Sequence, residues 1–566
     1  MKRINHGWDI ISGFLLVLVF SCSQDEVPVQ SNSLRIQVNN EVDILNPALS
    51  RLSVSTFIEN QMSLPLAKWD EDGKEWIPVL VQSYQPHITK QGVDYPLTTR
   101  VQARWSDGHP ISLNDILYTI KMGLNPHINH QSWAAYLDLI SDIREVGDTL
   151  FLTMETPYIL ADEFIAGLTP YPAHILDSAS LLDLIPFSSF LSGRFTSEQD
   201  QKLQTLAQSF NSWGSPEHWP KPVSGMFQVS NWIPGQQVTL DRVDNFWGRA
   251  IEELKPHFST NIDSVQFVVI PDPQNALHAF TSGAIDILST IDDRDSALLS
   301  SFYGQIHDVP TLQIYYLAVN NQHGLLCNRT IRQALNKAIN REDIIDRLFH
   351  GRGQPAYGPI HPDKSYYTPF PVTFDPVEAR RELEESGCLD NDGDGILECP
   401  VKDKFTKLSF GIWTTRSQLS RNVATLIKGY WKSIGVNLEI QSADFRSFLP
   451  ELQNKTYDLA TLALRQNNQL DDPFPLWHSS QSDAAGKNYQ GLENDSIDLV
   501  LEQLRESIVP GDQVNYYSRF QTLFADQIPV LFLVAPDEAI GVREGIELYW
   551  SSQRPGYDLL RSRINH

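Results

Sequence analysis

The chain has 566 residues, which is more than one hydrophobic core usually organises, so we expect two or three domains. Its formal net charge at pH 7 is −25, and this acidic excess argues against nucleic-acid binding, because phosphate recognition needs a basic surface. Hydrophobic residues make up 41% of the chain and charged residues 20%, values that are typical of a soluble globular protein.

The amino-terminal segment has the pattern of a signal peptide. A basic start, Lys2-Arg3, precedes an apolar run over residues 10–20. Because spanning a bilayer takes about 20 apolar residues, this run is too short for a stable membrane anchor, and it fits a signal-peptide core instead. The run ends in Val19-Phe20-Ser21-Cys22, which resembles a bacterial lipobox. We therefore assign residues 1–22 to a lipoprotein signal peptide.

In such lipoproteins the lipobox cysteine, here Cys22, carries the lipid and becomes the first residue of the mature chain. The alternative is an ordinary secretory signal in which this cysteine is incidental. Residues 23–32 are polar and short, as expected for a tether between lipid and fold. No later segment is apolar for long enough to span a membrane. We therefore expect a protein in the periplasm or at the cell surface, attached to a bacterial membrane only through its lipid anchor.

Beyond the tether, strand and helix patterns alternate along the chain. Apolar–polar alternation and short apolar runs predict strands at 34–38, 263–270, 315–319, 436–440, 457–464 and 528–534. Apolar residues at helical spacing predict helices at 113–120, 332–349, 423–434 and 495–508. A capping box formed by Ser112 and Asp115 precedes the first of these helices. This alternation predicts the α/β class.

The cysteines that follow Cys22 are Cys327, Cys388 and Cys399. Export to an oxidising compartment permits disulfides. We expect Cys388 and Cys399 to pair and to close a short loop that stabilises the fold by about 3 kcal/mol. Cys327 then remains, and we expect it to be a buried thiol. The spacing of cysteines and histidines does not fit a zinc site.

The segment between the paired cysteines resembles the front half of a calcium-binding loop. Asp390, Asp392 and Asp394 alternate as oxygen ligands would, and Gly395 stands at the sixth position. The twelfth position is Val401, where such a loop requires a bidentate glutamate, and Glu398 is the candidate substitute. We favour a turn-rich loop held by the disulfide and expect no bound metal.

Several short segments recur in an order typical of one protein family. They are Leu45-Asn46-Pro47-Ala48, Arg104–Pro110 with Asn114–Tyr118, Gly225-Met226-Phe227, Trp232–Gly235, Asn245–Gly248, Val269–Pro273, Gly283–Ile287, Ile331–Leu335, Ala338–Arg341, Asp472-Pro473, Trp477–Ser480 and Asn488-Tyr489. Each segment is weak evidence by itself. Their shared order across residues 34–545 resembles the family 5 extracellular solute-binding proteins of ABC importers, which include oligopeptide-, dipeptide- and nickel-binding proteins.

The resemblance implies a two-lobe periplasmic-binding-protein fold, of the Venus-flytrap type and similar to class II, with an extra domain inserted in the first lobe. The implied boundaries are 33–60, 191–317 and 535–566 for the first lobe, 61–190 for the insert and 318–534 for the second lobe. The chain would cross between the lobes near Tyr316–Asn320 and return near Phe532–Pro536. Closure of the lobes would bury the ligand.

Peptide-binding members of the family hold an extended ligand through its main chain. The resemblance places one such segment at Arg51-Leu52-Ser53 and a second at Trp413-Thr414-Thr415-Arg416-Ser417. The alternative is that both are plain surface loops. Trp413 and Trp477 are candidate cleft aromatics, although core packing explains either one as well.

Peptide binders of this family also use an aspartate to hold the ligand's amino terminus. The corresponding position in this chain is Asn467 or Gln469, depending on the direction of counting, and neither is charged. Asp471 and Asp472 lie nearby but out of register, and a gap in the alignment could still bring one of them into place, so both are candidates for this role. Arg465 is unusual here and could bind a carboxylate in a bidentate way, or could be paired internally with an aspartate.

We therefore expect a receptor that captures an oligopeptide or peptide-like solute for the permease and ATPase subunits of an ABC importer. A receptor for a metal chelate or a short glycan is the alternative within the class. A sensory or chaperone lipoprotein without a transport partner is the alternative outside it. We expect a monomer without cofactor and without catalytic residues, because the nucleophile-elbow, zinc-protease and phosphate-loop motifs are all missing from the sequence.

Overall fold

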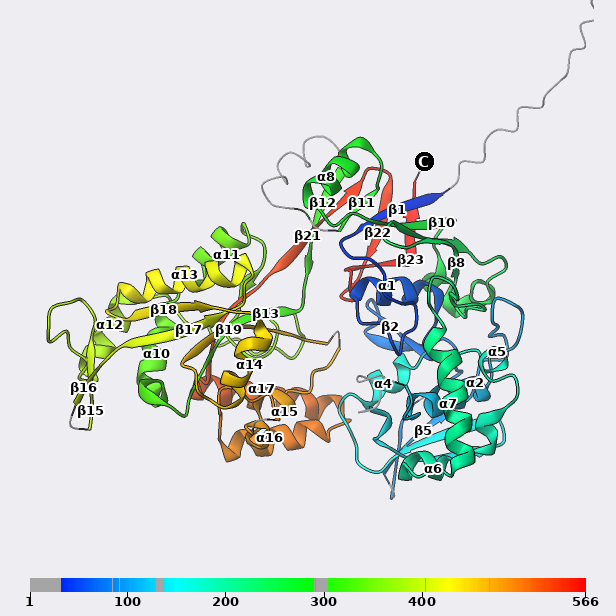
Figure 1. Ribbon diagram of the computed structural model, residues 1–566, viewed down its shortest axis with the longest axis horizontal. Coiled ribbons are helices and arrows are strands. Elements are labelled where there is room, and N and C mark those ends of the chain that lie inside the picture. Colours follow the sequence, from blue (N-terminus) through cyan, green and yellow to red (C-terminus); the bar gives the residue numbers. More distant parts are fainter. Residues whose placement is uncertain are drawn as a thin grey trace, which may run out of the picture.

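Two separate sheets, each covered by helices, form two lobes that lie side by side in Figure 1. The structure is a computed structural model that describes residues 32–565 except 84, 91, 129–135, 290, 292–303, 403, 468 and 484. Cys22, the signal peptide and the tether up to residue 31 lie outside the described residues. Among the described helices, none combines the length and apolarity needed to cross a bilayer.

The first lobe is organised around a mixed sheet with strand order β12-β21-β11-β1-β10-β9-β8. Its strands are β1 (Ser33–Val38), β8 (Phe227–Ile233), β9 (Gln237–Arg242), β10 (Ser264–Val269), β11 (Ile287–Leu288), β12 (Gly304–Pro310) and β21 (Asp537–Arg543). β1 runs parallel to β10, with Leu34 opposite Val265, and both side chains are fully buried. The strands predicted at 34–38 and 263–270 are therefore confirmed as adjacent strands of one sheet.

The second lobe has a sheet with strand order β14-β20-β13-β19-β17-β18. Its strands are β13 (Gln313–Val319), β14 (Gln354–Pro355), β17 (Ser409–Thr414), β18 (Asn437–Ser442), β19 (Leu459–Arg465) and β20 (Val530–Ala535). One face packs on α10 (Arg329–Lys337), α11 (Arg341–Leu348), α12 (Pro376–Glu385) and α13 (Gln418–Lys432). The other packs on α14 (Phe445–Gln453), α15 (Phe474–Trp477), α16 (Asp495–Arg505) and α17 (Pro510–Gln527). Apolar runs such as β20 are buried throughout because helices cover both faces.

The chain crosses between the lobes twice. β12 belongs to the first sheet and β13 to the second, so the first crossing consists of Thr311 and Leu312. This crossing lies before the predicted segment Tyr316–Asn320. The reason is that the apolar run at 315–319 pairs with β19 on one side and β20 on the other, which makes it a central strand of the second lobe. The return passes through Pro536, between β20 and β21.

The inserted segment carries a small sheet with strand order β4-β5-β7-β6 and several helices. Its strands are β4 (His87–Thr89), β5 (Gly92–Leu97), β6 (Ile140–Val146) and β7 (Thr149–Met154). The predicted capping box is confirmed at the start of α2 (Leu113–Gly123), where Ser112 N donates to Asp115 Oδ2 at 2.8 Å. α7 (Ser197–Ser212) shares an apolar cluster with α2. The helical part of the insert therefore extends past residue 190.

Two local predictions were wrong. The single helix predicted at 332–349 is divided into α10 and α11, because the side chain of Asn340 accepts from Asp343 N at 3.0 Å and starts a new helix. Cys327 was predicted to be buried but is exposed. It ends a short 3₁₀ turn, Gly324–Cys327, in which Leu326 is the residue that packs inward.

Candidate ligand-binding site

An open strand edge lies next to a cavity in the second lobe. β17 and β19 run parallel but pair only at Ile412–Leu459 and Trp413–Ala460. β17 ends at Thr414, one residue beyond these pairs, whereas β19 continues to Arg465 along β13. Within the described residues, no strand pairs with the β17-facing edge of Thr461–Arg465. Main-chain groups on this edge are therefore available to an added extended segment.

The cavity at this edge has a volume of about 560 Å³. It is lined by Tyr315, Tyr316, Thr415, Ser417, Leu419, Ser420, Val423, Phe445, Thr461, Leu462, Ala463, Leu464, Arg465, Pro475, Leu476, Lys487, Tyr489 and Leu533. The lining is mainly apolar and aromatic, with hydroxyl groups at the start of α13, as in typical small-molecule sites. Its volume lies within the range of about 300–1,000 Å³ that is usual for ligand pockets.

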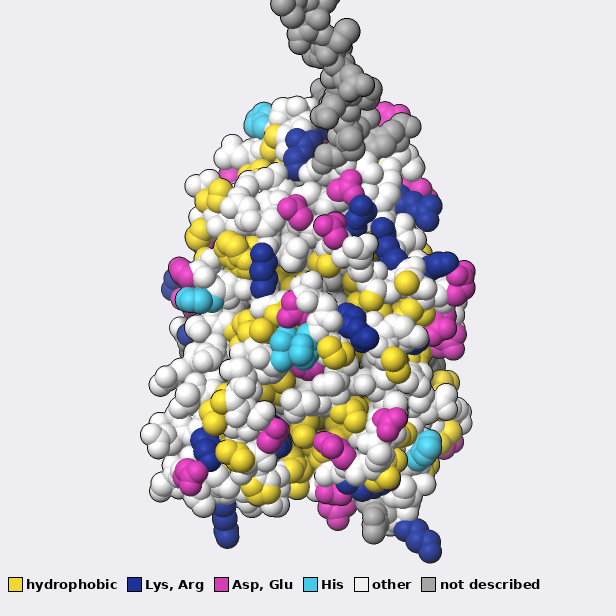
Figure 2. Space-filling view, turned by 90° about the vertical axis from the view of Figure 1, so that its right-hand side faces the viewer, with side chains coloured by type: hydrophobic (Ala, Val, Ile, Leu, Met, Phe, Trp, Pro, Cys, Tyr) yellow, Lys and Arg dark blue, Asp and Glu magenta, His cyan; other side chains and the backbone are white. Residues whose placement is uncertain are grey.

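The charged side chains that line this cavity are both cations, Arg465 and Lys487. Neither forms an ion pair with any described residue. Surrounding groups partly desolvate the Arg465 guanidinium, which lowers its pKa; nearby Arg554 lowers it further, whereas Glu538 raises it. The outer face of the first lobe, in contrast, shows acidic and basic side chains interspersed over its whole area (Figure 2).

Arg465 lies beside the crossing between the lobes. It is opposite Gln313, the first residue of β13 after the crossing. Glu538 is opposite Val309, shortly before the crossing, and belongs to the first lobe. Glu538 is held by Arg554, whose two terminal nitrogens lie 3.0 and 3.2 Å from its carboxylate oxygens. A guanidinium of the second lobe and an ion pair of the first lobe therefore flank the crossing.

Asp471 has partners on both carboxylate oxygens. Oδ1 accepts from Asn467 N at 2.8 Å, and Oδ2 accepts from the Tyr366 hydroxyl at 2.8 Å. Lys364 Nζ lies 3.7 Å from Oδ2. Burial raises the pKa of Asp471, and the Lys364 ammonium opposes this shift. Asp471 is thus already satisfied inside the protein.

Asp472 is also paired internally. Its Oδ2 lies 3.1 Å from Arg505 Nε and accepts from the Tyr158 hydroxyl at 3.2 Å. Burial raises the pKa of this carboxyl group, and the Arg505 charge lowers it. Asp472 lines a smaller cavity of about 170 Å³, to which Tyr136, Tyr158 and Leu160 of the insert contribute. Neither aspartate offers a free carboxylate to an incoming ammonium group.

The insert touches the second lobe near these aspartates. Ile159, between β7 and α4 (Ala161–Gly167), donates its backbone N–H to the Arg505 carbonyl oxygen at 2.8 Å. Ile159 and Leu160 are buried in an apolar cluster with Ile360, Tyr366, Leu504 and Tyr517 of the second lobe. In Figure 1, α4 faces the group of helices α15, α16 and α17. The lobes are thus joined both by the crossing strands and by this contact.

The first lobe contributes a third cavity of about 300 Å³. Trp69 and Trp76 line it from the hairpin of β2 (Ala67–Asp70) and β3 (Glu75–Pro78), with ring centroids 5.4 Å apart. Arg554 and Glu163 line it as well. The charges of Lys364 and Asp471 act on Glu163, whose pKa burial raises to about 7. This cavity therefore opens on the side of the first lobe that faces the second lobe.

The structure brings some of the predicted ligand residues to these cavities and not others. Thr415 and Arg465 line the cavity of about 560 Å³. Thr414 is fully buried, and Trp413 stacks on Phe448 with centroids 5.7 Å apart. Trp477 borders the smaller cavity but is 2% exposed and packs edge-on against Phe524, so its main contacts are in the core.

Arg51-Leu52-Ser53 lie elsewhere. Ser53 is the first residue of α1 (Ser53–Met62), with Leu52 at its N-cap, and Arg51 donates its backbone N–H to Asp43 Oδ2 at 3.0 Å. None of the three residues lines the cavities described above. Lys487 and the insert residue Tyr158 line cavities and were missed from the sequence, because no local pattern marks them. Tyr489 also lines a cavity; it belongs to the family-like segment Asn488-Tyr489 but was not predicted as a ligand residue.

The aspartate-rich loop is held together by protein groups. Lys407 Nζ lies 2.7 Å from Asp392 Oδ2 and also contacts Asp394. Asp390 accepts from the backbone N–H groups of Gly393 and Gly395. The carboxylates raise the pKa of the Lys407 ammonium. A protein cation thus stands among the candidate calcium ligands, as expected for a structural loop.

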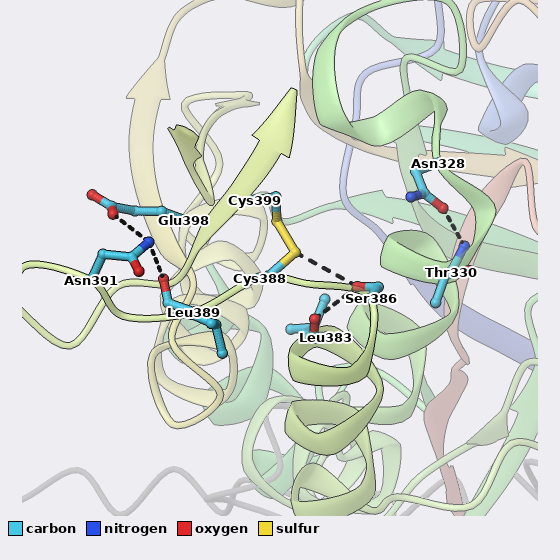
Figure 3. Close-up of a disulfide and its surroundings, with 9 residues drawn as sticks. All are labelled: Asn328, Thr330, Leu383, Ser386, Cys388, Leu389, Asn391, Glu398 and Cys399. Atoms are coloured by element: carbon cyan, nitrogen blue, oxygen red, sulfur yellow. Dashed lines mark hydrogen bonds between the residues drawn. A yellow bond between two sulfur atoms is a disulfide. The ribbon is translucent and has the colours of Figure 1, made fainter. Parts of the chain in front are cut away.

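Cys388 and Cys399 form a disulfide at the base of this loop, with their sulfurs 2.05 Å apart. Figure 3 shows the bond between the end of α12 and β15, with the Ser386 hydroxyl 3.6 Å from Cys388 Sγ. β15 (Glu398–Val401) pairs with β16 (Lys404–Lys407), and Val401 is opposite Lys404 in this hairpin. Val401 therefore belongs to a strand pair and is not placed as a ligand.

The chain is similar to known solute-binding proteins. Residues 75–486, more than half of the chain, match the bacterial extracellular solute-binding proteins, family 5 Middle. The oligopeptide-binding protein AppA of Bacillus subtilis (strain 168) is 23% identical over 536 residues, which cover 92% of this chain and 89% of AppA. The structure of AppA from Bacillus subtilis in complex with a nonapeptide has a TM-score of 0.66 at 21% identity and covers 94% of this chain and 99% of its own.

A second solved structure is that of NikA from Brucella suis in complex with Fe(III)-EDTA. It has a TM-score of 0.73 at 18% identity and covers 94% of this chain and 100% of its own. At these identities the structural similarities establish the two-lobe fold and leave the ligand to be argued from the site itself.

Proposed function

The chain belongs to the bacterial extracellular solute-binding proteins of family 5, and on this basis we propose that it captures an oligopeptide or peptide-like solute between its lobes and delivers it to the permease of an ABC importer. The relatives named as oligopeptide-binding and dipeptide-binding proteins support this class of ligand. Matching over most of the chain means that both lobes are included in the similarity.

One structural observation carries the peptide assignment. Because β17 ends at Thr414, the β17-facing edge of Thr461–Arg465 is left without a strand partner among the described residues, beside a cavity large enough for several residues of an extended chain. A peptide added to this edge would gain main-chain hydrogen bonds that do not depend on its sequence, while the apolar lining would receive its side chains. Closure of the lobes would then shield these bonds from water.

The test is native mass spectrometry of the purified chain from residue 23 onward, before and after incubation with a mixed peptide digest. We expect captured masses that correspond to short peptides, and their distribution would show the preferred length. An Ala463→Trp variant should lose capture, because this exposed position lines the cavity and a tryptophan there would fill it. Ala179→Trp, in an exposed turn of the insert, is the matched control and should retain capture.

A metal chelate is the second candidate ligand, since a structurally similar protein was solved with Fe(III)-EDTA. Failure of the wild type to capture any peptide at millimolar supply, together with binding of a metal chelate in the same experiment, would reject the peptide assignment and leave the receptor role intact. Peptide capture that survives Ala463→Trp would reject this cavity as the site.

We also propose that the protein acts by binding alone, as a monomer, and that a lipid on Cys22 holds it in the periplasm or at the cell surface. The lipobox-like sequence supports the anchor. A Cys22→Ser variant, expressed in a bacterial host, should move from the detergent-extracted membrane fraction to the soluble fraction. Retention of this variant in the membrane fraction would reject the lipid anchor.

A further inference from the structure

A smaller cavity, of about 170 Å³, adjoins the candidate peptide site. The residues that it shares with the wall of the cavity of about 560 Å³ are Leu464, Arg465, Pro475 and Leu476. The insert adds Tyr136, Tyr158 and Leu160, so much of the wall of the smaller cavity is apolar or aromatic. An extended ligand lying in the larger cavity would therefore reach the smaller one with one of its ends.

The charged side chains in the wall of the smaller cavity are Arg465, Asp471 and Asp472. Each aspartate lies against a cation of the protein: Lys364 Nζ is 3.7 Å from Asp471 Oδ2, and Arg505 Nε is 3.1 Å from Asp472 Oδ2. Arg465, in contrast, makes no ion pair with any described residue. The charge in this wall that has no counter-charge among the described residues is therefore positive.

Hydrogen bonds also occupy the oxygens of both aspartates. In Asp471, Oδ1 accepts from a backbone N–H at 2.8 Å and Oδ2 accepts from the Tyr366 hydroxyl at 2.8 Å. In Asp472, Oδ1 accepts from a backbone N–H at 3.1 Å and Oδ2 accepts from the Tyr158 hydroxyl at 3.2 Å. The side chains of Asp471 and Asp472 are 11% and 5% exposed. All four carboxylate oxygens thus have a donor inside the protein.

An ammonium group in the smaller cavity would find no free carboxylate. It would lose part of its hydration, which is costly for a charge without a partner, and it would meet the positive charge of Arg465. An uncharged group avoids both costs. An acyl group would in addition bury apolar surface against Tyr136, Tyr158 and Leu160.

We propose that the receptor prefers peptides whose amino terminus is acylated or otherwise uncharged, because its smaller cavity accepts an uncharged ligand end and disfavours an ammonium group. Arg505 and Lys364 are positioning residues for this preference, since they act on the ligand only through Asp472 and Asp471, whose charges they offset. This inference rests on the proposed function and specifies its ligand class.

Three synthetic peptides of one sequence test the preference. The sequence is taken from the mass-spectrometry screen, and the amino terminus is free, acetylated or replaced by hydrogen in a des-amino first residue. The des-amino peptide has neither the ammonium nor the acyl group, so it separates the loss of charge from the gain of apolar contact. Affinities are measured by isothermal titration calorimetry at about pH 6.5, where a free amino terminus is almost fully protonated.

We expect the wild type to bind the acetylated and des-amino peptides about tenfold or more tightly than the free-amine peptide, as for a buried charge without a partner. Asn467→Asp should lower this ratio about fivefold or more, because Asn467 is an exposed residue of the same wall and the substitution adds a carboxylate there. Asn454→Asp is the matched control and should keep the ratio, since Asn454 is exposed and lines none of the cavities described above.

Arg505→Gln tests the positioning role. It leaves Asp472 without its counter-charge, so that an ammonium group can replace the guanidinium, and we expect the free-amine peptide to gain about tenfold relative to the des-amino peptide. Arg519→Gln should leave the ratio unchanged, because Arg519 is an exposed residue of α17 that lines none of these cavities. Thermal unfolding establishes that each variant is folded under the assay conditions.

Two results would overturn the inference. One is a wild type that binds the free-amine peptide as tightly as the des-amino peptide, or more tightly. The other is that Asn467→Asp and Arg505→Gln are folded and both keep the wild-type ratio of affinities. In both cases peptides still bind, so the proposed function stands. If the mass-spectrometry screen captures no peptide, the proposed function fails and the inference fails with it.

Discussion

The Thr311 hydroxyl donates a hydrogen bond of 2.8 Å to the carbonyl oxygen of Pro536. These two residues belong to the two segments that cross between the lobes, and Thr311 is 4% exposed. The bond therefore links the two crossings to each other.

Thr311→Val tests this coupling. The substitution keeps the shape of the side chain but leaves the Pro536 carbonyl without its donor, and we expect the free energy of unfolding to fall by about 1–2 kcal/mol. Urea denaturation followed by circular dichroism measures the change. Thr205→Val is the control, because Thr205 makes an exposed hydrogen bond within α7, and its effect should stay within about 0.5 kcal/mol. Equal effects of the two substitutions would contradict a special role for Thr311.

The disulfide should stabilise the second lobe. Replacement of both Cys388 and Cys399 by serine removes a cross-link between residues separated by 11 positions. We expect a loss of about 3 kcal/mol in the free energy of unfolding, because the unfolded chain regains the entropy that the loop had removed. Cys327→Ser should have almost no effect, since this thiol is exposed and unpaired. A reductant that destabilises the wild type but not the double variant would support the same assignment.

Burial of Glu59 makes stability depend on pH. Desolvation raises the pKa of this carboxyl group to about 8; the hydrogen bond from Ser50 lowers it and the charge of Asp43 raises it. In the unfolded chain the group would ionise near its ordinary pKa of about 4.3. The native state therefore binds more protons between these values, and its stability is complete below the unfolded pKa and declines as pH rises through the folded one.

Glu59→Gln should remove this contribution. Relative to the wild type, we expect the variant to gain on the order of 4 kcal/mol in the free energy of unfolding when pH is raised from 5 to 8.5, since the amide has no charge to bury. Denaturant unfolding at both pH values measures the difference. Glu217→Gln, at an exposed position, serves as the control. A pH-independent difference between Glu59→Gln and the wild type would contradict the prediction.

Arg505 should be needed to keep Asp472 ionised. Asp472 has a side chain that is 5% exposed, and removal of its partner leaves a buried charge unpaired. We expect Arg505→Gln to lower the free energy of unfolding by about 2 kcal/mol at pH 7 and by less at acidic pH, where Asp472 is protonated. The comparison is Arg416→Gln, which breaks a pair with Asp444 whose side chains are 71% and 64% exposed, so about 0.5 kcal/mol or less is expected. A double variant with Asp472→Asn should recover part of the loss at Arg505, and failure to do so would contradict the pairing argument.

Much of the fold followed from local patterns. Strands were predicted from the apolar runs that form β13 and β20 and from the apolar–polar alternation that forms β1. These predictions were possible because the spacing of apolar residues within a segment indicates which of its side chains are buried. The capping box at Ser112 and the order of family-like segments were equally local. The position of the first crossing could not be predicted locally, because an apolar run does not indicate which strands will pair with its two edges.

The site depended on contacts between distant parts of the chain. Arg465 could be singled out from the sequence, but its lack of an ion pair with any described residue and its place beside Lys487 in a cavity could not. Asp471 and Asp472 were candidates for an ammonium group until folding supplied Tyr366 and Arg505 as their partners.

The sequence by itself determined the class, the family and most of the strands, because these are encoded in residue periodicity and in the order of short motifs. Only the tertiary structure decided which charged groups are satisfied and which remain free to bind. The physical reason is that the energy of a charge depends on every group within a few ångströms, and folding draws those groups from segments that are remote in the chain.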